Sequence, residues 1–249
     1  MELQDLQRNW DGLGAADPLW AILTYPDRHG NKWTPDEFFA TGEEWITRYE
    51  RIQSEVSISP DRQERALDFG CGAGRLTRAL GTRYAHVDGV DIAESMVELA
   101  RRHHEGRTGL SFHVNERPDL QLFEADAFDF IVSIIVFQHM NPQLIAGYLG
   151  EFVRILRPGG VAMFNIPSHL DRSPQGLLRR VPNRIQNRWR RRRYGYSEVI
   201  ELHTLHRDRV KQLIVAAGGV VSAVVPDDNP GRPFHTFVYV VTKPTAASA

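Results

Sequence analysis

"ALDFGCGAGRLTRAL", residues 66–80, decides the fold of this chain of 249 residues. An apolar run ends in Asp68 and Phe69, and three glycines follow within five positions. Glycine allows a positive φ and lets a ligand approach the backbone without a Cβ in the way. The stretch therefore predicts a buried strand, then a ligand-binding loop, then a helix that begins at Gly74.

The chain around this loop alternates between predicted strands and predicted helices. The strands cover residues 65–70, 86–92, 110–115, 128–137 and 161–168, and the helices between them cover 74–84, 94–106 and 141–156. A helix over 207–219 and two strands, 220–226 and 234–243, are predicted to close the chain. This alternation indicates βαβ units and an α/β fold with a doubly wound parallel sheet. Right-handed crossovers then bring the carboxyl ends of the parallel strands to one edge, where ligands bind.

The first sixty residues are predicted to form a helical extension that acts as a lid. Thr34 and Pro35 fit an N-cap and a first helical position, and acidic residues follow in the first turn. Four of the five tryptophans lie in this part of the chain. We therefore expect two regions, a lid over residues 1–60 and an α/β domain over residues 61–249.

Two acidic residues indicate what the glycine loop holds. A dinucleotide loop needs Gly or Ala at the sixth position of G-x-G-x-x-G, where this chain has Arg75. Asp68 precedes the loop, where a carboxylate would repel a pyrophosphate but attract an ammonium group. Asp91 ends the next predicted strand, at the spacing from Gly70 that lets a carboxylate reach a ribose diol. Together they indicate a nucleoside that carries an amino acid.

Four ordered motifs resemble those of the class I S-adenosylmethionine-dependent methyltransferases. The first motif is matched by "LDFGCGAGR", the second by "GVDIAESM", the fourth strand by "FDFIVSIIVFQHM" and the turn before the fifth strand by "LRPGG". The resemblance covers about residues 64–170 and implies a Rossmann-like, seven-stranded sheet whose last strand is antiparallel. It also implies S-adenosyl-L-methionine as the cofactor and S-adenosyl-L-homocysteine as the product.

The same resemblance implies which residues bind the cofactor. Asp68 would act near its amino group and Asp91 at both ribose hydroxyls. Asn115 and Glu116 are alternative partners of the adenine amino group, and the sequence does not decide between them. The other expected cofactor residues are Gly70, Cys71, Gly72, Gly74 and Arg75 in the loop, Ile92 and Met96 beside the adenine, and Ser133 and Ile134 after the fourth strand.

Methyl transfer to an oxygen requires the removal of a proton, a task for which an imidazole is suited. His139 follows the fourth predicted strand at the ligand edge and is the first candidate base. The alternative is that it caps or packs against the next helix. His203 and Glu201, which precede the last helix, are further catalytic candidates. The residues expected to contact the acceptor are Gln138, Trp10 and Trp20.

An arginine-rich stretch between Arg179 and Arg193 holds eight arginines in fifteen residues. It falls within an expected insertion of about residues 170–200, after the fifth predicted strand. Arg190 and Arg193 are expected to bind an anionic or lipid-linked acceptor, or to contact a membrane surface. The alternative is a solvated charged segment without a ligand.

Composition and motifs disfavour several other classes of protein. The formal net charge of −1 argues against a nucleic-acid surface, and no metal-binding constellation is evident. The longest apolar stretch is too short to span a membrane, and the N-terminus lacks the pattern of a secretory signal. A single cysteine excludes an internal disulfide. We therefore expect a cytoplasmic protein.

The predicted function is O-methylation of a small molecule, a sugar or a glycolipid. One alternative is an N-methyltransferase that acts on a small amine or a peptide. Another is a non-catalytic regulatory protein that binds S-adenosylmethionine. A nicotinamide-dependent enzyme is disfavoured by Asp68 and Arg75. The sequence does not decide the oligomeric state.

Overall fold

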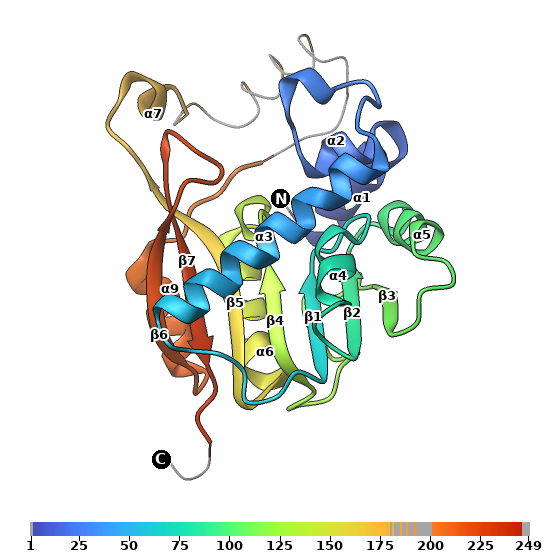
Figure 1. The fold of residues 1–249 in the computed structure, drawn as a ribbon. Coiled ribbons are helices and arrows are strands. Elements are labelled where there is room, and N and C mark those ends of the chain that lie inside the picture. Colours follow the sequence, from blue (N-terminus) through green and yellow to red (C-terminus); the bar gives the residue numbers. More distant parts are fainter. Residues whose placement is uncertain are drawn as a thin grey trace.

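A seven-stranded sheet in the order β3-β2-β1-β4-β5-β7-β6 forms the centre of the molecule (Figure 1). The computed structural model describes residues 2–179, 181, 185, 188, 192 and 201–245. The strands are β1 (Arg65–Phe69), β2 (His86–Asp91), β3 (Leu110–Val114), β4 (Phe128–Ser133), β5 (Leu156–Leu170), β6 (Val220–Asp227) and β7 (Phe234–Thr242). β7 runs antiparallel to both β5 and β6, and the other neighbouring strands pair in parallel. The predicted mostly parallel sheet with an antiparallel last strand is confirmed.

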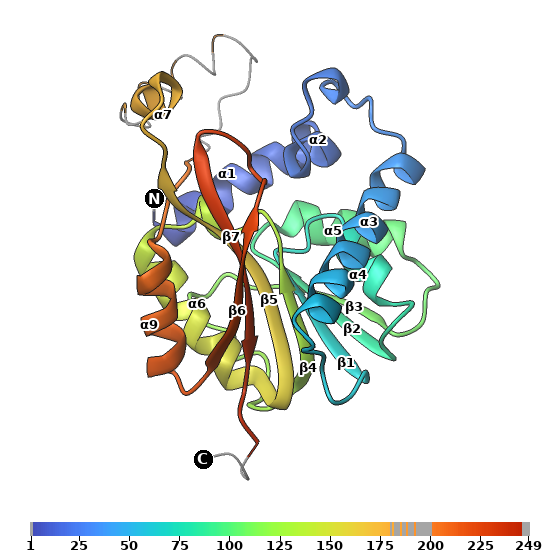
Figure 2. The same ribbon diagram turned by 60° about the vertical axis from the view of Figure 1, so that its left-hand side comes forward.

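Helices cover both faces of this sheet (Figures 1 and 2). α3 (Pro35–Glu55) and α4 (Arg75–Leu80) pack on one face, and α6 (Pro142–Ile155) and α9 (Arg207–Ala216) pack on the other. α5 (Glu94–His103) packs against β2 and β3. The remaining elements are α1 (Leu3–Ala16), α2 (Pro18–Ile22), η1 (Pro26–Arg28), η2 (Phe137–His139) and α7 (Pro174–Arg179). α1 and α2 lie beyond the carboxyl ends of the parallel strands, where a lid was predicted.

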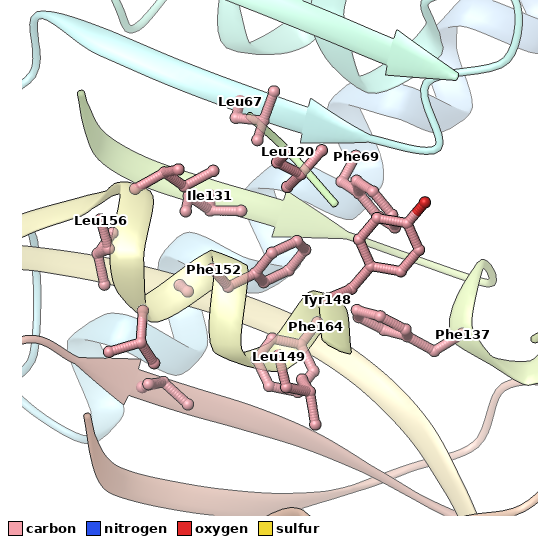
Figure 3. Close-up of a cluster of buried hydrophobic side chains, with 14 of the residues drawn as sticks. Leu67, Phe69, Leu120, Ile131, Phe137, Tyr148, Leu149, Phe152, Leu156 and Phe164 are labelled. Atoms are coloured by element: carbon pink, nitrogen blue, oxygen red, sulfur yellow. The ribbon is translucent and has the colours of Figure 1, made fainter. Parts of the chain in front are cut away.

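The core beneath α6 holds the chain segments that build the ligand edge (Figure 3). Phe69, the last residue of β1, lies 4.7 Å from Tyr148 of α6 between ring centroids. Phe137, the first residue of η2, lies 5.5 Å from Phe152. Burying one such aromatic side chain stabilises the fold by about 1.5–3 kcal/mol. The cluster therefore fixes the end of β1 and the turn after β4 relative to each other.

The predicted start of the long helix α3 is confirmed in detail. Thr34 is its N-cap and accepts a hydrogen bond from the Glu37 amide, while the Glu37 carboxylate accepts one from the Thr34 amide. This reciprocal capping satisfies two amide donors that would otherwise be unpaired at the helix start. The buried face of α3 includes Ile46, Tyr49 and Ile52, which pack onto the sheet.

The predicted strand over residues 128–137 is wrong in its second half, because β4 ends at Ser133. Ile135 has a φ of +66°, which a strand does not allow. Its amide donates to Asn165 Oδ1 at 2.9 Å, so it leaves the strand ladder. The predicted turn at 156–160 is also wrong, since β5 begins at Leu156, which pairs with Phe128.

Among the residues that the structure describes, no helix is long and apolar enough to cross a membrane.

Candidate functional site

A cavity of about 390 Å³ lies at the carboxyl edge of the sheet. Its walls come from the loop after β1, the end of β2, the turn from β4 to η2, the N-terminal helices α1 and α2, and the turn between β6 and β7. Five segments that are far apart in the sequence therefore meet around one space. This is the edge at which open α/β sheets bind ligands.

The glycine loop forms one wall because its backbone turns where side chains do not fit. Gly70 and Gly72 have φ values of +77° and +52°. A Cβ on Gly70 would lie 2.3 Å from a methyl carbon of Val136, and one on Gly72 would lie 2.6 Å from Ile22 Cδ1. Glycine at these two positions therefore allows both the turn and the close approach of α2 and of the segment after β4.

Asp91 is the last residue of β2 and lines the cavity beside this loop. Its Oδ2 accepts a hydrogen bond from the Gly72 amide at 2.8 Å, and its Oδ1 accepts one from the Ala93 amide at 3.0 Å. Burial raises the pKa of Asp91, while these amide donors oppose the rise. Each oxygen of a carboxylate has a second lone pair, so the side chain can still accept two hydroxyl donors.

Asp68 and Arg75 place two opposite charges in the same cavity wall. Asp68 is 1% exposed, and its Oδ2 accepts from the amide and hydroxyl of Thr77, at 2.9 and 2.7 Å. Its Oδ1 is buried without a hydrogen-bond partner among the described residues. Burial raises the pKa of Asp68 to about 6, against the opposing effects of the Thr77 hydrogen bonds and the Arg75 charge.

Arg75 is 3% exposed and begins α4 directly after the glycine loop. Its Nη1 donates to the carbonyl and hydroxyl oxygens of Thr41, at 3.2 and 3.3 Å. Its Nε is buried with no partner in the described part of the chain. Burial lowers the pKa of Arg75 to about 10, and the carboxylate of Asp68 opposes this effect. One buried acceptor and one buried donor thus lack partners in one wall.

The structure places the two candidate partners of the adenine amino group differently. Asn115 lines the cavity, but its Nδ2 donates to the carbonyls of Arg117 and Asp119, at 3.2 and 2.7 Å. Glu116 is exposed and accepts a hydrogen bond from Gln7 of α1 instead of lining the cavity. Asn115 therefore shapes this wall, and Glu116 attaches α1 to it.

His139 lines the cavity at the end of η2. Its Nδ1 lies 3.1 Å from the carbonyl oxygen of Glu201, and its Nε2 lies 3.2 Å from the side-chain nitrogen of Gln138. Because a carbonyl only accepts, Nδ1 carries the proton, and the lone pair of Nε2 accepts a hydrogen bond from the Gln138 side-chain amide. The Trp10 ring packs edge-to-face on the imidazole, with centroids 4.9 Å apart. The N-cap of α6 is Asn141, so His139 does not cap that helix.

The other two catalytic candidates form a pair behind this position. His203 Nε2 lies 2.9 Å from a carboxylate oxygen of Glu201, and neither residue lines the cavity. The His203 amide donates to the Gln138 carbonyl at 2.7 Å, which attaches the segment before α9 to η2. The geometry thus connects the pair to His139 through the Glu201 carbonyl and through Gln138.

Most residues expected at the site do line the cavity. They are Asp68, Gly70, Cys71, Gly72, Arg75, Asp91, Ile92, Met96, Asn115 and Ile134 on the expected cofactor side, and Trp10, Trp20, Gln138 and His139 on the expected acceptor side. Gly74, Glu116 and Ser133 do not line it. Arg190 and Arg193 lie outside the described residues.

Several lining residues were missed by the sequence analysis. They include Leu6, Ile22, His29, Tyr148, Leu202, Pro230, Arg232 and Phe234. The turn between β6 and β7 showed only the glycine and prolines of a turn, and nothing in that pattern indicates which turn reaches a ligand edge. No group of three or more potential metal-binding side chains occurs within the described ranges.

Comparisons with known proteins agree with this geometry. Residues 66–160 match the model of a family described as a methyltransferase domain. The chain is 29% identical to the ubiquinone biosynthesis O-methyltransferase of Hahella chejuensis over 46% of this chain and 47% of that protein. It is 27% identical to a trans-aconitate 2-methyltransferase of an Acidovorax species, over 57% and 56%. The chain thus spans about half the length of the curated relatives it matches.

A solved structure has the same fold at low identity. It is a S-adenosylmethionine-dependent methyltransferase of Leishmania major, 17% identical, with a TM-score of 0.63 over 96% of this chain and 82% of that one. The fold of this chain is that of the class I S-adenosylmethionine-dependent methyltransferases. The matched family and the solved structure both point to methyltransferases, and the solved structure is named as one that depends on S-adenosylmethionine.

Proposed function

We propose that this protein transfers a methyl group from S-adenosylmethionine to a hydroxyl group of a small molecule. The observation that supports it most is the wall in which Asp68 Oδ1 and Arg75 Nε are both buried without partners among the described residues. An amino acid is the ligand that supplies an ammonium donor and a carboxylate acceptor together. The cofactor contributes this zwitterion and a sulfonium methyl group that is ready for transfer.

The chain's own residues would then divide the cofactor between them. Asp68 accepts from the ammonium group, and the Arg75 guanidinium donates to the carboxylate, a charge-assisted hydrogen bond. Asp91 accepts from the ribose hydroxyls with the lone pairs that Gly72 and Ala93 leave available. Ile92 and Met96 supply apolar contact for the base.

We assign the general base to His139. Its protonated Nδ1 is held by the Glu201 carbonyl, so Nε2 is the nitrogen that can take a hydroxyl proton, once the acceptor hydroxyl replaces the Gln138 amide that now donates to it. Trp10 fixes the ring plane from the lid. The preference for oxygen is also supported by the relative named as an O-methyltransferase of ubiquinone biosynthesis.

Calorimetry with two nucleosides tests the cofactor assignment. S-adenosylhomocysteine has the amino acid, whereas 5′-methylthioadenosine keeps only the nucleoside. Substituting Asp68→Asn or Arg75→Met is expected to weaken S-adenosylhomocysteine binding by about tenfold or more, since a hydrogen bond to a charged group contributes about 1.5–3 kcal/mol. Binding of 5′-methylthioadenosine should change little.

Asp91→Ala should weaken the binding of both nucleosides, because both carry the ribose diol. The matched control is Glu98→Ala, an exposed carboxylate on α5 that does not line the cavity. Binding of NAD in place of S-adenosylhomocysteine, or loss of affinity in Glu98→Ala, would contradict the assignment.

A pH profile tests His139. In His139→Gln, kcat for a hydroxyl acceptor is expected to fall by about 10²–10⁴-fold, the usual contribution of a general base, with S-adenosylhomocysteine affinity unchanged. A histidine base makes kcat rise with pH, and this rise should be absent in His139→Gln. His203→Gln serves as the comparison. Because His203 does not line the cavity, its substitution should lower kcat less than His139→Gln does. Equal losses with the same pH profile would show that His139 is not the base.

A further inference from the structure

The order of the strands divides the cavity into two halves. The glycine loop follows β1 and Asp91 ends β2, and both strands lie on one side of β4. The turn between β6 and β7, residues 228–233, belongs to the opposite side of the sheet, beyond β5. Figures 1 and 2 show this turn reaching past the sheet on the same side as α1 and α2. The cofactor residues therefore occupy one half, and the acceptor half is bordered by this turn.

Charge differs between the two halves. On the cofactor side, the charged lining residues are Asp68, Asp91 and Arg75, each with a role in the proposed cofactor contacts. On the other side, Arg232 lines the cavity from the turn. This arginine is exposed and forms no hydrogen bond or ion pair with any residue that the structure describes, and its charge helps to lower the pKa of the Asp171 carboxyl. A permanent cation therefore faces the half of the cavity that the cofactor does not use.

The surroundings of Arg232 suit an apolar ligand body. Phe234, two residues further on, lines the same cavity, as do Pro230 and Leu202. Trp10 closes it from α1 and packs on His139. An acceptor in this half would meet apolar and aromatic walls, the guanidinium of Arg232, the imidazole of His139 and the side-chain amide of Gln138. That combination matches an apolar or aromatic body with a hydroxyl at one end and an anion at the other.

We propose that Arg232 binds an anionic group of the acceptor, a carboxylate, while the acceptor's hydroxyl faces His139. The planar guanidinium fork matches a carboxylate with two parallel hydrogen bonds. This assignment rests on the proposed function and specifies its acceptor class, hydroxylated organic acids. It is independent of the arginine-rich stretch, because Arg232 lies on a different segment.

Binding to the cofactor-loaded protein tests this proposal without turnover. Calorimetry is performed in saturating S-adenosylhomocysteine with three aromatic probes: benzoate, phenylphosphonate and the neutral benzamide. Wild type is expected to bind benzoate more tightly than benzamide. Arg232→Gln should weaken the affinity for benzoate by about tenfold or more, since a charge-assisted bidentate contact is lost, and should leave the affinity for benzamide unchanged. Arg232→Lys keeps the charge without the fork and should lose less.

Arg209→Gln is the matched control, because Arg209 is an exposed arginine on α9 outside the cavity. It should bind benzoate as wild type does. Equal weakening in this control, unchanged benzoate affinity in Arg232→Gln, or no benzoate binding to the loaded wild type would overturn the proposal. Tighter binding of phenylphosphonate than of benzoate would overturn the choice of carboxylate in favour of a phosphate. Failure of the protein to bind S-adenosylhomocysteine at all would instead refute the proposed function.

Discussion

At the scale of single residues, Asp68 shows how burial adapts a carboxylate to its ligand. The side chain is buried at the end of β1, and Thr77 at the start of α4 uses one of its oxygens. Burial alone would neutralise it, but the Thr77 donors and the Arg75 charge hold its pKa at about 6. The Asp68 carboxylate is therefore charged at neutral pH and can accept hydrogen bonds from an ammonium group. It becomes neutral when the pH falls below its pKa of about 6.

This pKa predicts a pH-dependent cofactor affinity. Ionised Asp68 attracts the ammonium group of S-adenosylhomocysteine, so affinity should fall as pH drops below about 6, approaching tenfold per pH unit. The measurement is calorimetry between pH 5 and pH 8. Asp68→Asn should flatten the profile, and 5′-methylthioadenosine should show little dependence in either protein. Identical profiles for both nucleosides would exclude Asp68 as the ammonium partner.

The same shift has a consequence for stability without ligand. The folded pKa of about 6 lies above the ordinary 3.8, so between these values the folded state binds more protons than the unfolded state. The contribution of Asp68 to the free energy of unfolding therefore decreases as pH rises from about 4 to about 6. Denaturant titrations of wild type and Asp68→Asn should converge at the acidic end and differ most above pH 6.

At the scale of elements, a buried polar relay joins four segments. Arg48 of α3 pairs with Asp227 Oδ1 at the end of β6, at 2.8 Å. Asn165 of β5 donates to Asp227 Oδ2 at 2.8 Å and accepts from the Ile135 amide at 2.9 Å. Ile135 lines the cavity with a φ of +66°, a costly conformation for a β-branched residue. The relay thus holds a strained segment of the site from three other elements.

Asp227→Asn should therefore destabilise the fold. The Asp227 side chain is fully buried whereas that of Arg48 is 30% exposed, so we expect a loss of about 2 kcal/mol in the free energy of unfolding rather than the full cost of a buried unpaired charge. Hydrogen exchange at the Ile135 amide should also accelerate. Asp228→Asn changes the neighbouring exposed carboxylate and should have little effect on either quantity. Similar losses in the two variants would contradict the relay.

At the scale of the whole molecule, helix α1 contacts the sheet edge on both halves of the cavity. The Asp11 carboxylate accepts from the amide and hydroxyl of Ser95 at the start of α5, both at 3.2 Å. Gln7 contacts Glu116 after β3, and Trp10 contacts His139 after β4. A ligand that fills the cavity would contact the lid and the sheet edge together.

Cofactor binding should consequently protect the lid. Amides of α1 and α2 are expected to exchange more slowly with deuterium when S-adenosylhomocysteine is bound, because Leu6, Trp20 and Ile22 line the cavity. Hydrogen exchange with mass spectrometry, with and without the nucleoside, gives the measurement. Helix α9, which does not line the cavity, is the internal reference. Protection confined to the glycine loop would show that the lid is not coupled to the cofactor.

Local features of the chain were predictable from the sequence alone. The strand, glycine loop and helix over residues 66–80 are encoded in neighbouring residues, as is the capping box at Thr34. The spacing of Asp91 from Gly70 follows from the length of one βα unit. These features depend on backbone conformation and on periodicity within a few turns of chain, which single-sequence patterns express.

Contacts across the sheet were decided only by the tertiary structure. Arg75 donates to Thr41, 34 residues earlier in the sequence, and the packing of distant segments decides that Asp68 and Arg75 are buried with one unpaired atom each. The apolar run over residues 128–137 resembles a single strand in the sequence. The hydrogen bond that takes the Ile135 amide out of the strand ladder goes to Asn165, thirty residues later. Arg232 reached the site because β7 inserts between β5 and β6. Such contacts depend on how crossovers order the strands, and no local pattern along the chain specifies that order.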